Sequence, residues 1–306
     1  MKVHMKTLRL FLLVLVLSLH YAHSQERISE RALWSVDLLN NYRVISNVTY
    51  SVATGYECKL DAYVRNSSAG PVPTVLYIHG GGWVAGTKEA AVMNIFPYLE
   101  MGFSVVNVEY RLAKVALAPA AVEDCRLALR WVFKNAKTYG FDTTKVIVTG
   151  GSAGGHLALM TGMLDASAGF DWPKDWDAAT PNPKVSVIIN WFGITDVNDL
   201  LSGVVTPNYA AAWIGNQLNR EAIAKRVSPL TYVRKNLPPI FTVHGDKDQL
   251  VPYNHAVRLH EALTKAGVVN QLVTIPGGKH GGFSPEEMLN IISGIREFLK
   301  KQGILQ

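Results

Sequence analysis

The stretch KVIVTGGSAGGHLALM, residues 145–160, decides how the chain is interpreted. One apolar run ends at Thr149, another begins after His156, and two glycines stand on each side of the pair Ser152-Ala153. Glycine inside a helix or strand costs roughly 0.5–1 kcal/mol relative to alanine, so these glycines weaken both elements where they meet. The pattern therefore predicts a sharp turn from a strand into a helix, with the Ser152 hydroxyl at its tip.

Residues 150–154 match Gly-x-Ser-x-Gly, which between a strand and a helix is typical of a nucleophile elbow. In such a turn the serine is exposed above the sheet, and the N–H of the next residue, Ala153, points at the atom that the serine attacks. A plain structural turn and a phosphate-binding loop are the alternatives. The stretch lacks the lysine of a Walker loop and the third glycine of a dinucleotide fingerprint.

Outside this stretch, apolar runs alternate with amphipathic ones. The central runs are apolar throughout, as in strands buried on both faces of a parallel sheet. We predict an α/β fold with a doubly wound, mostly parallel sheet and helices on both faces. The predicted strands lie at 47–52, 58–64, 74–80, 104–110, 145–150, 185–192, 238–245 and 270–277, and the predicted helices at 119–138, 154–164, 255–267 and 285–301.

Two stretches interrupt the alternation. Residues 165–184 are rich in Trp, Pro and Asp, and residues 193–237 show only short helical patterns. Such insertions either cover a site, as a lid does, or form a surface excursion, and the sequence leaves both open. We expect residues 25–306 to form a single catalytic domain that carries both insertions.

The sequence HGGGW, residues 79–83, follows another predicted strand. Successive glycines let backbone N–H groups turn inward, as in the loop that supplies half of an esterase oxyanion hole. We expect Gly81 and Gly82, together with Ala153, to donate hydrogen bonds to an oxyanion. Each donor would stabilise the transition state by about 3–4 kcal/mol.

A serine nucleophile needs a base and a carboxylate that orients the base. HGDKDQLVP (244–252) offers two aspartates after one late strand, and GGKHGGF (277–283) offers His280 after the next. The order serine, acid, histidine is typical of α/β-hydrolases. We select Asp248 as the acid, since Asp246 directly follows a glycine turn and is expected to make a local turn bond. His79 and His156 are expected to hold local structure.

Aromatic residues at strand ends are candidate substrate contacts. Trp83 ends the HGGGW sequence, and Trp191 and Phe192 end the predicted strand 185–192. Trp213 and Phe283 are weaker candidates. For each of them a place in the core is an equal alternative.

The N-terminal residues 1–24 have the order of a secretory signal peptide: basic residues, a short apolar run, then the small residues Ala22-His23-Ser24. We expect cleavage after Ser24 and a secreted or periplasmic protein without a stable membrane span. The alternative is an uncleaved anchor, although the apolar run is shorter than the roughly 20 residues that span a bilayer.

The full chain has 30 Lys+Arg and 24 Asp+Glu, a net charge of +6. Cleavage would remove three basic residues and lower this charge to +3, which is too mild to indicate a nucleic-acid partner. Two distant cysteines, Cys58 and Cys125, leave a disulfide open but indicate no metal site. Asn47 and Asn66 begin glycosylation sequons.

With these motifs in order, the chain resembles the α/β-hydrolase esterases, in particular the feruloyl-esterase-like (BD-FAE) group, which is related to the bacterial hormone-sensitive-lipase-type esterases. The resemblance spans about residues 60–284. The matching stretches are LDAYV (60–64), YIHGGGWVAGTK (77–88), VEYRLA (108–113), APAAVEDCRLALRWV (118–132), GFDTTKVIVTGGSAGGHLA (140–158), PPIFTVHGDKDQLVP (238–252) and PGGKHGGF (276–283).

The resemblance implies a Ser152–Asp248–His280 triad and a serine carboxylesterase that acts on small esters, without a metal or cofactor. Acetyl and feruloyl esters of plant polysaccharide are the candidate substrates. Relatives of hormone-sensitive lipase usually carry an acidic residue where Gly151 stands, so the feruloyl-esterase-like group fits better. Three alternatives remain: an arylformamidase or other amide hydrolase, a peptidase with the same triad, and a non-catalytic binding protein of this fold.

Overall fold

The computed structural model describes residues 32–67, 69–171, 182–202 and 208–306. The described part of a first unit, which ends at Tyr42, is helical over 32–41, and residues from Arg43 onward form a second unit. The predicted signal peptide and residues 172–181 of the first predicted insertion lie outside the described residues.

In the described part of the chain, eight strands form one sheet in the order β1-β2-β4-β3-β5-β6-β7-β8. β2 runs antiparallel to β4, and each neighbouring pair from β4 to β8 is parallel. The predicted α/β fold is confirmed. The strands are β1 (Tyr42–Ala53), β2 (Tyr56–Arg65), β3 (Val72–Ile78), β4 (Ser104–Val108), β5 (Phe141–Gly151), β6 (Val187–Trp191), β7 (Ile240–Gly245) and β8 (Asn270–Ile275).

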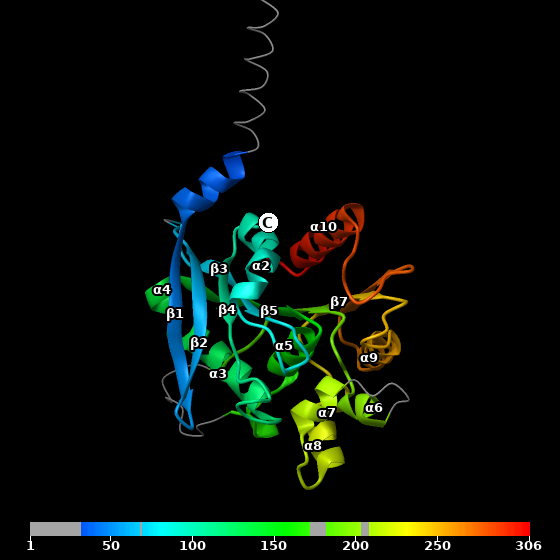
Figure 1. The fold of residues 1–306 in the computed structure, drawn as a ribbon. Helices are drawn as coiled ribbons and strands as arrows, with labels where there is room; N and C mark the ends of the chain where they lie inside the picture. Colours follow the sequence, from blue (N-terminus) through cyan, green and yellow to red (C-terminus); the bar gives the residue numbers. More distant parts are fainter. Residues whose placement is uncertain (1–31, 68, 172–181, 203–207) are drawn as a thin grey trace, which may run out of the picture. The chain divides into compact units, whose positions relative to one another are not determined.

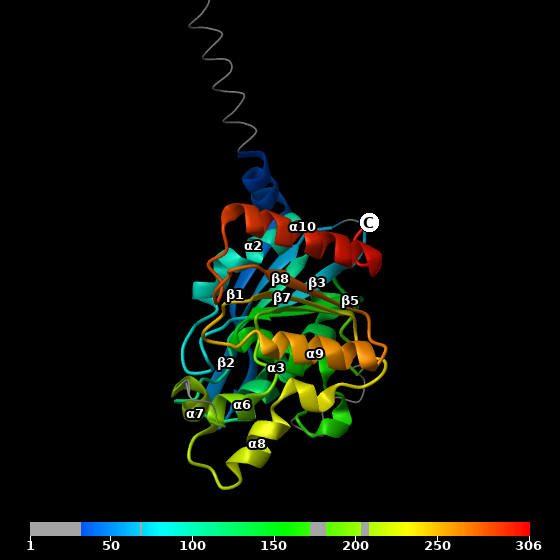
Figure 2. The same ribbon diagram turned by 90° about the vertical axis from the view of Figure 1, so that its right-hand side faces the viewer.

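Helices cover both faces of the sheet, as Figures 1 and 2 show. Helices α2 (Val92–Glu100) and α10 (Pro285–Lys301) lie on one face, and α3 (Ala120–Lys134), α5 (Ala153–Met163) and α9 (Asn254–Lys265) lie on the other. The sequence prediction omitted α2, which carries Pro97 in its interior, a position that proline disfavours. Shorter helical segments are η1 (Glu89–Ala91), α4 (Ala136–Tyr139) and η2 (Ala166–Ala168).

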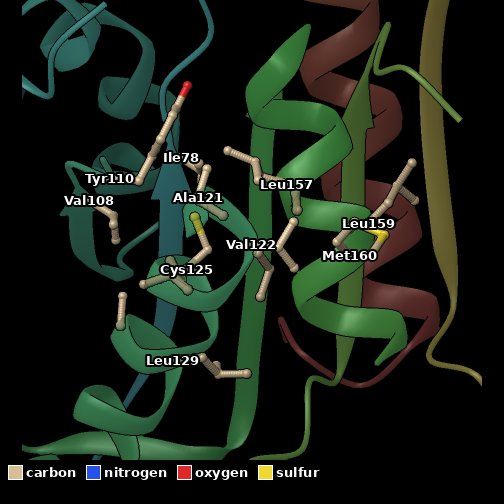
Figure 3. Close-up of a cluster of buried hydrophobic side chains, with 14 of the residues drawn as sticks. Ile78, Val108, Tyr110, Ala121, Val122, Cys125, Leu129, Leu157, Leu159 and Met160 are labelled. Carbon is tan, nitrogen blue, oxygen red and sulfur yellow. The ribbon is translucent and has the colours of Figure 1, made fainter. Parts of the chain in front are cut away.

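The core lies between the central strands and the helices. β4 is buried along its whole length, and α5 is buried on nearly every side, which explains why neither shows a polar face. Figure 3 shows part of this core, where Val122 and Cys125 of α3 gather with Leu157 of α5 and Ile78 of β3. This packing holds β5, the strand that leads into Ser152, in the centre of the sheet.

The second predicted insertion folds into short helices: α6 (Val197–Ser202), α7 (Asn208–Ile214), α8 (Arg220–Arg226) and η3 (Pro229–Tyr232). It is attached to the core, because Trp213 of α7 is fully buried and stacks on Trp83 with ring centroids 4.1 Å apart. Its described part is therefore not a loose surface excursion.

Cys58 and Cys125 are both buried and free, so the disulfide that the sequence left open is not formed. Burial raises the pKa of the Cys58 thiol to about 12, so it carries little thiolate at neutral pH. Within the described ranges, no helix has the length and apolar character needed to cross a membrane.

Candidate active site

The turn after β5 holds Ser152 in a strained backbone conformation, with φ 58° and ψ −122°. The Ser152 N–H donates to the carbonyl oxygen of Trp191 at the end of β6, with N and O 2.9 Å apart. Gly154 must be a glycine, because a β-carbon there would lie 2.1 Å from the carbonyl oxygen of Ile78. Strain of this kind persists only where the surroundings enforce it, and here two neighbouring strands do so.

The HGGGW loop follows β3 and turns at two glycines with positive φ, 114° at Gly81 and 59° at Gly82. The Gly81 carbonyl accepts from the N–H groups of Val84 and Ala85, which closes the turn. Within the described chain, no backbone hydrogen bond starts from the N–H of Gly81 or Gly82. Ala153 is the first residue of α5, so its N–H also lacks an acceptor within the helix. These three N–H groups are thus available to a ligand.

His79 anchors the loop, as predicted. Its Nδ1 donates to the Gly80 carbonyl oxygen at 2.7 Å, and its ring stacks on Tyr110 with centroids 4.4 Å apart. Burial lowers the pKa of His79 and so favours its neutral form.

Asp248 and His280 come from the loops after β7 and β8, and the structure brings them into contact. Asp248 Oδ2 lies 2.7 Å from His280 Nδ1, and the Asp248 side chain is fully buried while that of His280 is 17% exposed. Burial opposes ionisation of Asp248, but hydrogen bonds from His244, His280 and the Val251 N–H hold the pKa of Asp248 well below its usual range. Asp248 is therefore a carboxylate at neutral pH, as an orienting group for His280 must be.

Asp246 has a different task from the one predicted. Its Oδ1 accepts from the Gly277 N–H at 2.7 Å, across 31 residues of chain, so the predicted local turn bond is wrong. The contact is long-range because the loops after two neighbouring parallel strands end at the same edge of the sheet. Asp246 thus ties the loop of Asp248 to the loop of His280.

Ser152 and His280 both line one cavity of about 690 Å³. In the described part of the chain, no hydrogen bond joins the Ser152 hydroxyl to His280. The ring of Phe192, which also lines this cavity, packs edge-on against His280 with centroids 4.7 Å apart. Catalytic hydrogen bonds are often long in a ligand-free site and tighten when substrate binds.

Trp191, Phe192 and Phe283 line this cavity, but Trp83 does not. Trp83 is fully buried, stacks on Trp213 and donates from Nε1 to His156 Nδ1 at 3.2 Å. Its assignment as a substrate contact is wrong, because the insertion helix α7 covers it. Trp213 is buried in the same stack and also lies outside the cavity lining.

Several lining residues were not found from the sequence. Helices α2 and α10 supply an apolar wall, and Tyr209 of α7 lies beside the HGGGW loop, where its Cβ would be 2.7 Å from a β-carbon on Gly82. The Tyr209 hydroxyl donates to the Leu250 carbonyl oxygen at 2.9 Å. The lining residues absent from the sequence prediction are Tyr77, Val84, Met93, Asn94, Pro97, Tyr98, Tyr209, Leu250, Met288 and Ile292.

The α10 part of this wall was predicted as a helix from its amphipathic pattern over 285–301, whereas α2 was not predicted. Among the described residues, no group of three or more His, Cys, Asp or Glu could hold a metal ion.

The sheet order, the strained serine turn after the central strand and the acid and histidine after the last two strands together define an α/β-hydrolase fold. The chain is an α/β-hydrolase. The family model BD-FAE matches residues 60–263, and the chain therefore belongs to the BD-FAE family, as the sequence motifs indicated.

Two of the curated relatives are mycobacterial esterases that overlap this chain in part. Esterase LipQ of Mycobacterium tuberculosis (strain ATCC 25618 / H37Rv) is 26% identical over 210 residues, which cover 68% of this chain and 50% of LipQ. Esterase LipC of the same organism is 26% identical over 224 residues, 69% of this chain and 53% of LipC. The chain spans about half the length of these curated relatives.

Two solved structures match this chain over most of both chains, unlike the curated relatives. A truncated form of a carbohydrate esterase from gut microbiota superposes with a TM-score of 0.72 at 28% identity, covering 86% of this chain and 96% of the other. Esterase 2 of Thermogutta terrifontis with bound propionate gives a TM-score of 0.69 at 25% identity, covering 87% and 96%.

Proposed function

We propose that this chain is a serine carboxylesterase in which Ser152, Asp248 and His280 form the catalytic triad. The observation that carries the proposal is the 2.7 Å contact between Asp248 and His280 beside the cavity that Ser152 also lines. Membership of the BD-FAE family and the esterase relatives support the same reaction class.

The proposed reaction follows from the hydrogen-bond donors. A carboxylate only accepts hydrogen bonds, so His280 Nδ1 carries a proton and its Nε2 keeps a lone pair for the serine proton. Ser152 Oγ attacks the ester carbonyl carbon while His280 takes its proton, and the carbonyl oxygen becomes an oxyanion that accepts from Gly81, Gly82 and Ala153.

Collapse of this intermediate breaks the bond to the leaving alcohol, which His280 protonates, and an acyl-Ser152 remains. Water, deprotonated by the same histidine, then attacks the acyl group and releases the acid. The two steps balance with water as the only co-reactant.

The proposed substrates are small carboxylic esters, with acetyl and feruloyl esters of plant polysaccharide as the first candidates. The cavity volume lies within the 300–1,000 Å³ that is usual for small-molecule sites, and aromatic and aliphatic side chains line most of it. The neighbour described as a carbohydrate esterase favours such esters as the first to be tried.

We also propose that the protein is secreted or periplasmic, with residues 1–24 removed on export. The basic, apolar and small-residue order of that segment supports this location. Expression of the full chain in a secreting host, followed by N-terminal sequencing of the exported protein, should give Gln25 as the first residue. Retention in the membrane fraction with an intact N-terminus would contradict cleavage.

Initial rates on p-nitrophenyl acetate, butyrate and octanoate and on methyl ferulate test the proposed function. Turnover should be abolished by Ser152→Ala and kept by Ser186→Ala, a control at the opposite end of the sheet where β6 begins. The order of the initial rates on these esters would show which acyl length the pocket accepts. Folded protein without turnover on any ester would contradict the proposal and direct attention to amide substrates.

A further inference from the structure

His244 lies one residue before the end of β7 and has no described role in ester hydrolysis. Its side chain is completely buried. Its Nε2 lies 2.9 Å from the carbonyl oxygen of Val251 and 3.2 Å from Asp248 Oδ2. The histidine therefore contacts the carboxylate, and it is not among the residues that line the cavity of Ser152 and His280.

The contact with Val251 fixes the tautomer of His244. A carbonyl oxygen can only accept, so Nε2 must carry the proton. The opposite ring nitrogen, Nδ1, is buried without a hydrogen-bond partner among the described residues, which suits an unprotonated nitrogen better than a second N–H. His244 thus presents one N–H, and that N–H is shared between the backbone of the turn and the acid.

The hydrogen bonds of Asp248 show why this second donor matters. Oδ1 accepts from the backbone N–H groups of Leu250 and Val251, at 2.8 and 2.9 Å. Oδ2 accepts from His280 and is approached by His244 from the interior. The backbone N–H groups hold Oδ1 and His244 holds Oδ2 independently of His280. The carboxylate therefore cannot rotate about its terminal torsion, and Oδ2 stays aimed at His280.

We propose that His244 is a positioning residue for the acid Asp248: its Nε2–H holds Oδ2 and the turn of residues 248–251 in place, and so fixes the orientation of the His280 ring. This inference rests on the proposed function, because it assigns a role within the same triad. The ring of Tyr253 packs edge-on against His244, with centroids 5.7 Å apart, and keeps the imidazole from turning away.

Two substitutions separate the hydrogen bond from the volume of the side chain. His244→Phe keeps a ring but removes the N–H, whereas His244→Gln keeps an N–H near the position of Nε2. A misplaced catalytic group can cost about 100-fold in rate, so His244→Phe should lower kcat by about 10- to 100-fold with little change in KM. His244→Gln should recover most of that loss.

The matched control is His260→Phe, since His260 is also buried but bonds to Asn270 and does not contact Asp248. It should lower the melting temperature without lowering kcat. If His244→Phe does not fold, His244→Gln and His244→Asn still test the claim, because the asparagine amide is too short to reach Oδ2 and should be the slower of the two. Equal kcat for these two variants, or wild-type kcat in folded His244→Phe, would overturn the proposal.

A second readout does not depend on ester turnover. The proton between His280 Nδ1 and Asp248 should give a low-field resonance in the ¹H NMR spectrum, assigned by its absence in His280→Gln. This resonance should shift or broaden in His244→Phe and persist in His260→Phe. An unchanged resonance overturns the positioning role. A wild type without esterase activity that still shows the predicted resonance changes would overturn the proposed function alone.

Discussion

The α-carbon of Gly150 faces the carbonyl oxygen of Ile78 so closely that a β-carbon on Gly150 would lie 2.3 Å from that oxygen. Ile78 is the last residue of β3 and pairs with Gly150 across the parallel strands β3 and β5. One strand leads into the HGGGW loop and the other into Ser152, so the two loops start from a backbone contact with no room for a side chain. That contact fixes the distance between the proposed oxyanion donors and the proposed nucleophile.

Gly150→Ala should therefore abolish esterase activity, because backbone atoms cannot yield to a β-carbon at 2.3 Å. Gly151→Ala is the matched control. Its β-carbon would meet the edge of the Phe192 ring at 3.4 Å and the Trp191 Cβ at 3.8 Å, which are ordinary contacts, so kcat/KM should stay within a few-fold of wild type. Steady-state kinetics on p-nitrophenyl acetate distinguish the two, and equal activity in both variants would contradict this account of the turn.

Trp83 and Trp191 should respond in opposite ways to truncation. Trp83→Ala removes a fully buried ring and should cost about 3–5 kcal/mol of unfolding free energy, as measured by urea denaturation. Trp191→Ala should leave stability nearly unchanged and alter KM for esters with large acyl groups, since this side chain lines the cavity. If Trp83→Ala instead kept full stability and altered KM, Trp83 would be a substrate contact and its place in the core would be contradicted.

Tyr209 links the insertion helix α7 to the turn that carries the acid, through its bond to the Leu250 carbonyl. Burial and the nearby negative charge of Asp248 raise the pKa of its hydroxyl to about 12, so it remains a donor throughout the neutral range. Tyr209→Phe should cost roughly 0.5–1.5 kcal/mol of unfolding free energy. It should also raise KM, because the turn beside the cavity loosens. Unchanged unfolding free energy together with unchanged KM would show that the hydrogen bond from Tyr209 to Leu250 stabilises neither the fold nor the cavity.

Stability should fall in mild acid because of His156. Burial, partly offset by its hydrogen bond to the Val227 carbonyl, lowers the pKa of His156 to about 4. In the unfolded chain the His156 imidazole takes up a proton near pH 6.5. Neutral His156 therefore contributes fully to the unfolding free energy above pH 6.5, and this contribution is lost as the pH falls toward 4.

The slope of unfolding free energy against pH should then decrease in His156→Gln, by up to about 1.4 kcal/mol per pH unit. The pKa of buried His255 is also lowered to about 4, and burial lowers the pKa values of His79 and His260 as well. His156→Gln should therefore reduce the slope without abolishing it. Parallel urea-denaturation curves for wild type and His156→Gln between pH 6.5 and 4.5 would contradict this assignment.

Much of the fold could be predicted because its signals are local. The continuous apolar run of β4 and the glycines around Ser152 each fit a single local conformation, and their order along the chain selects the sheet type. Helix α2 could not be predicted, since its interior proline contradicts a helix and only packing against β4 makes the helix favourable. The same proline lines the cavity, so one wall of the site was missed along with the helix.

The site was predictable where it depends on strand ends. Asp248 and His280 follow neighbouring parallel strands, and their contact follows from that order. The place of Trp83 depends instead on Trp213, which lies 130 residues further along and stacks on it. The role of Asp246 likewise depends on the spacing of two loops that no local pattern encodes.

The most direct test of the central claim is covalent labelling with paraoxon, followed by peptide mapping by mass spectrometry. An organophosphate reacts with an activated serine hydroxyl, so we expect one diethylphosphoryl group on the peptide that contains Ser152 and none in Ser152→Ala. Labelling at another residue, or unreactive protein that still hydrolyses esters, would contradict Ser152 as the nucleophile.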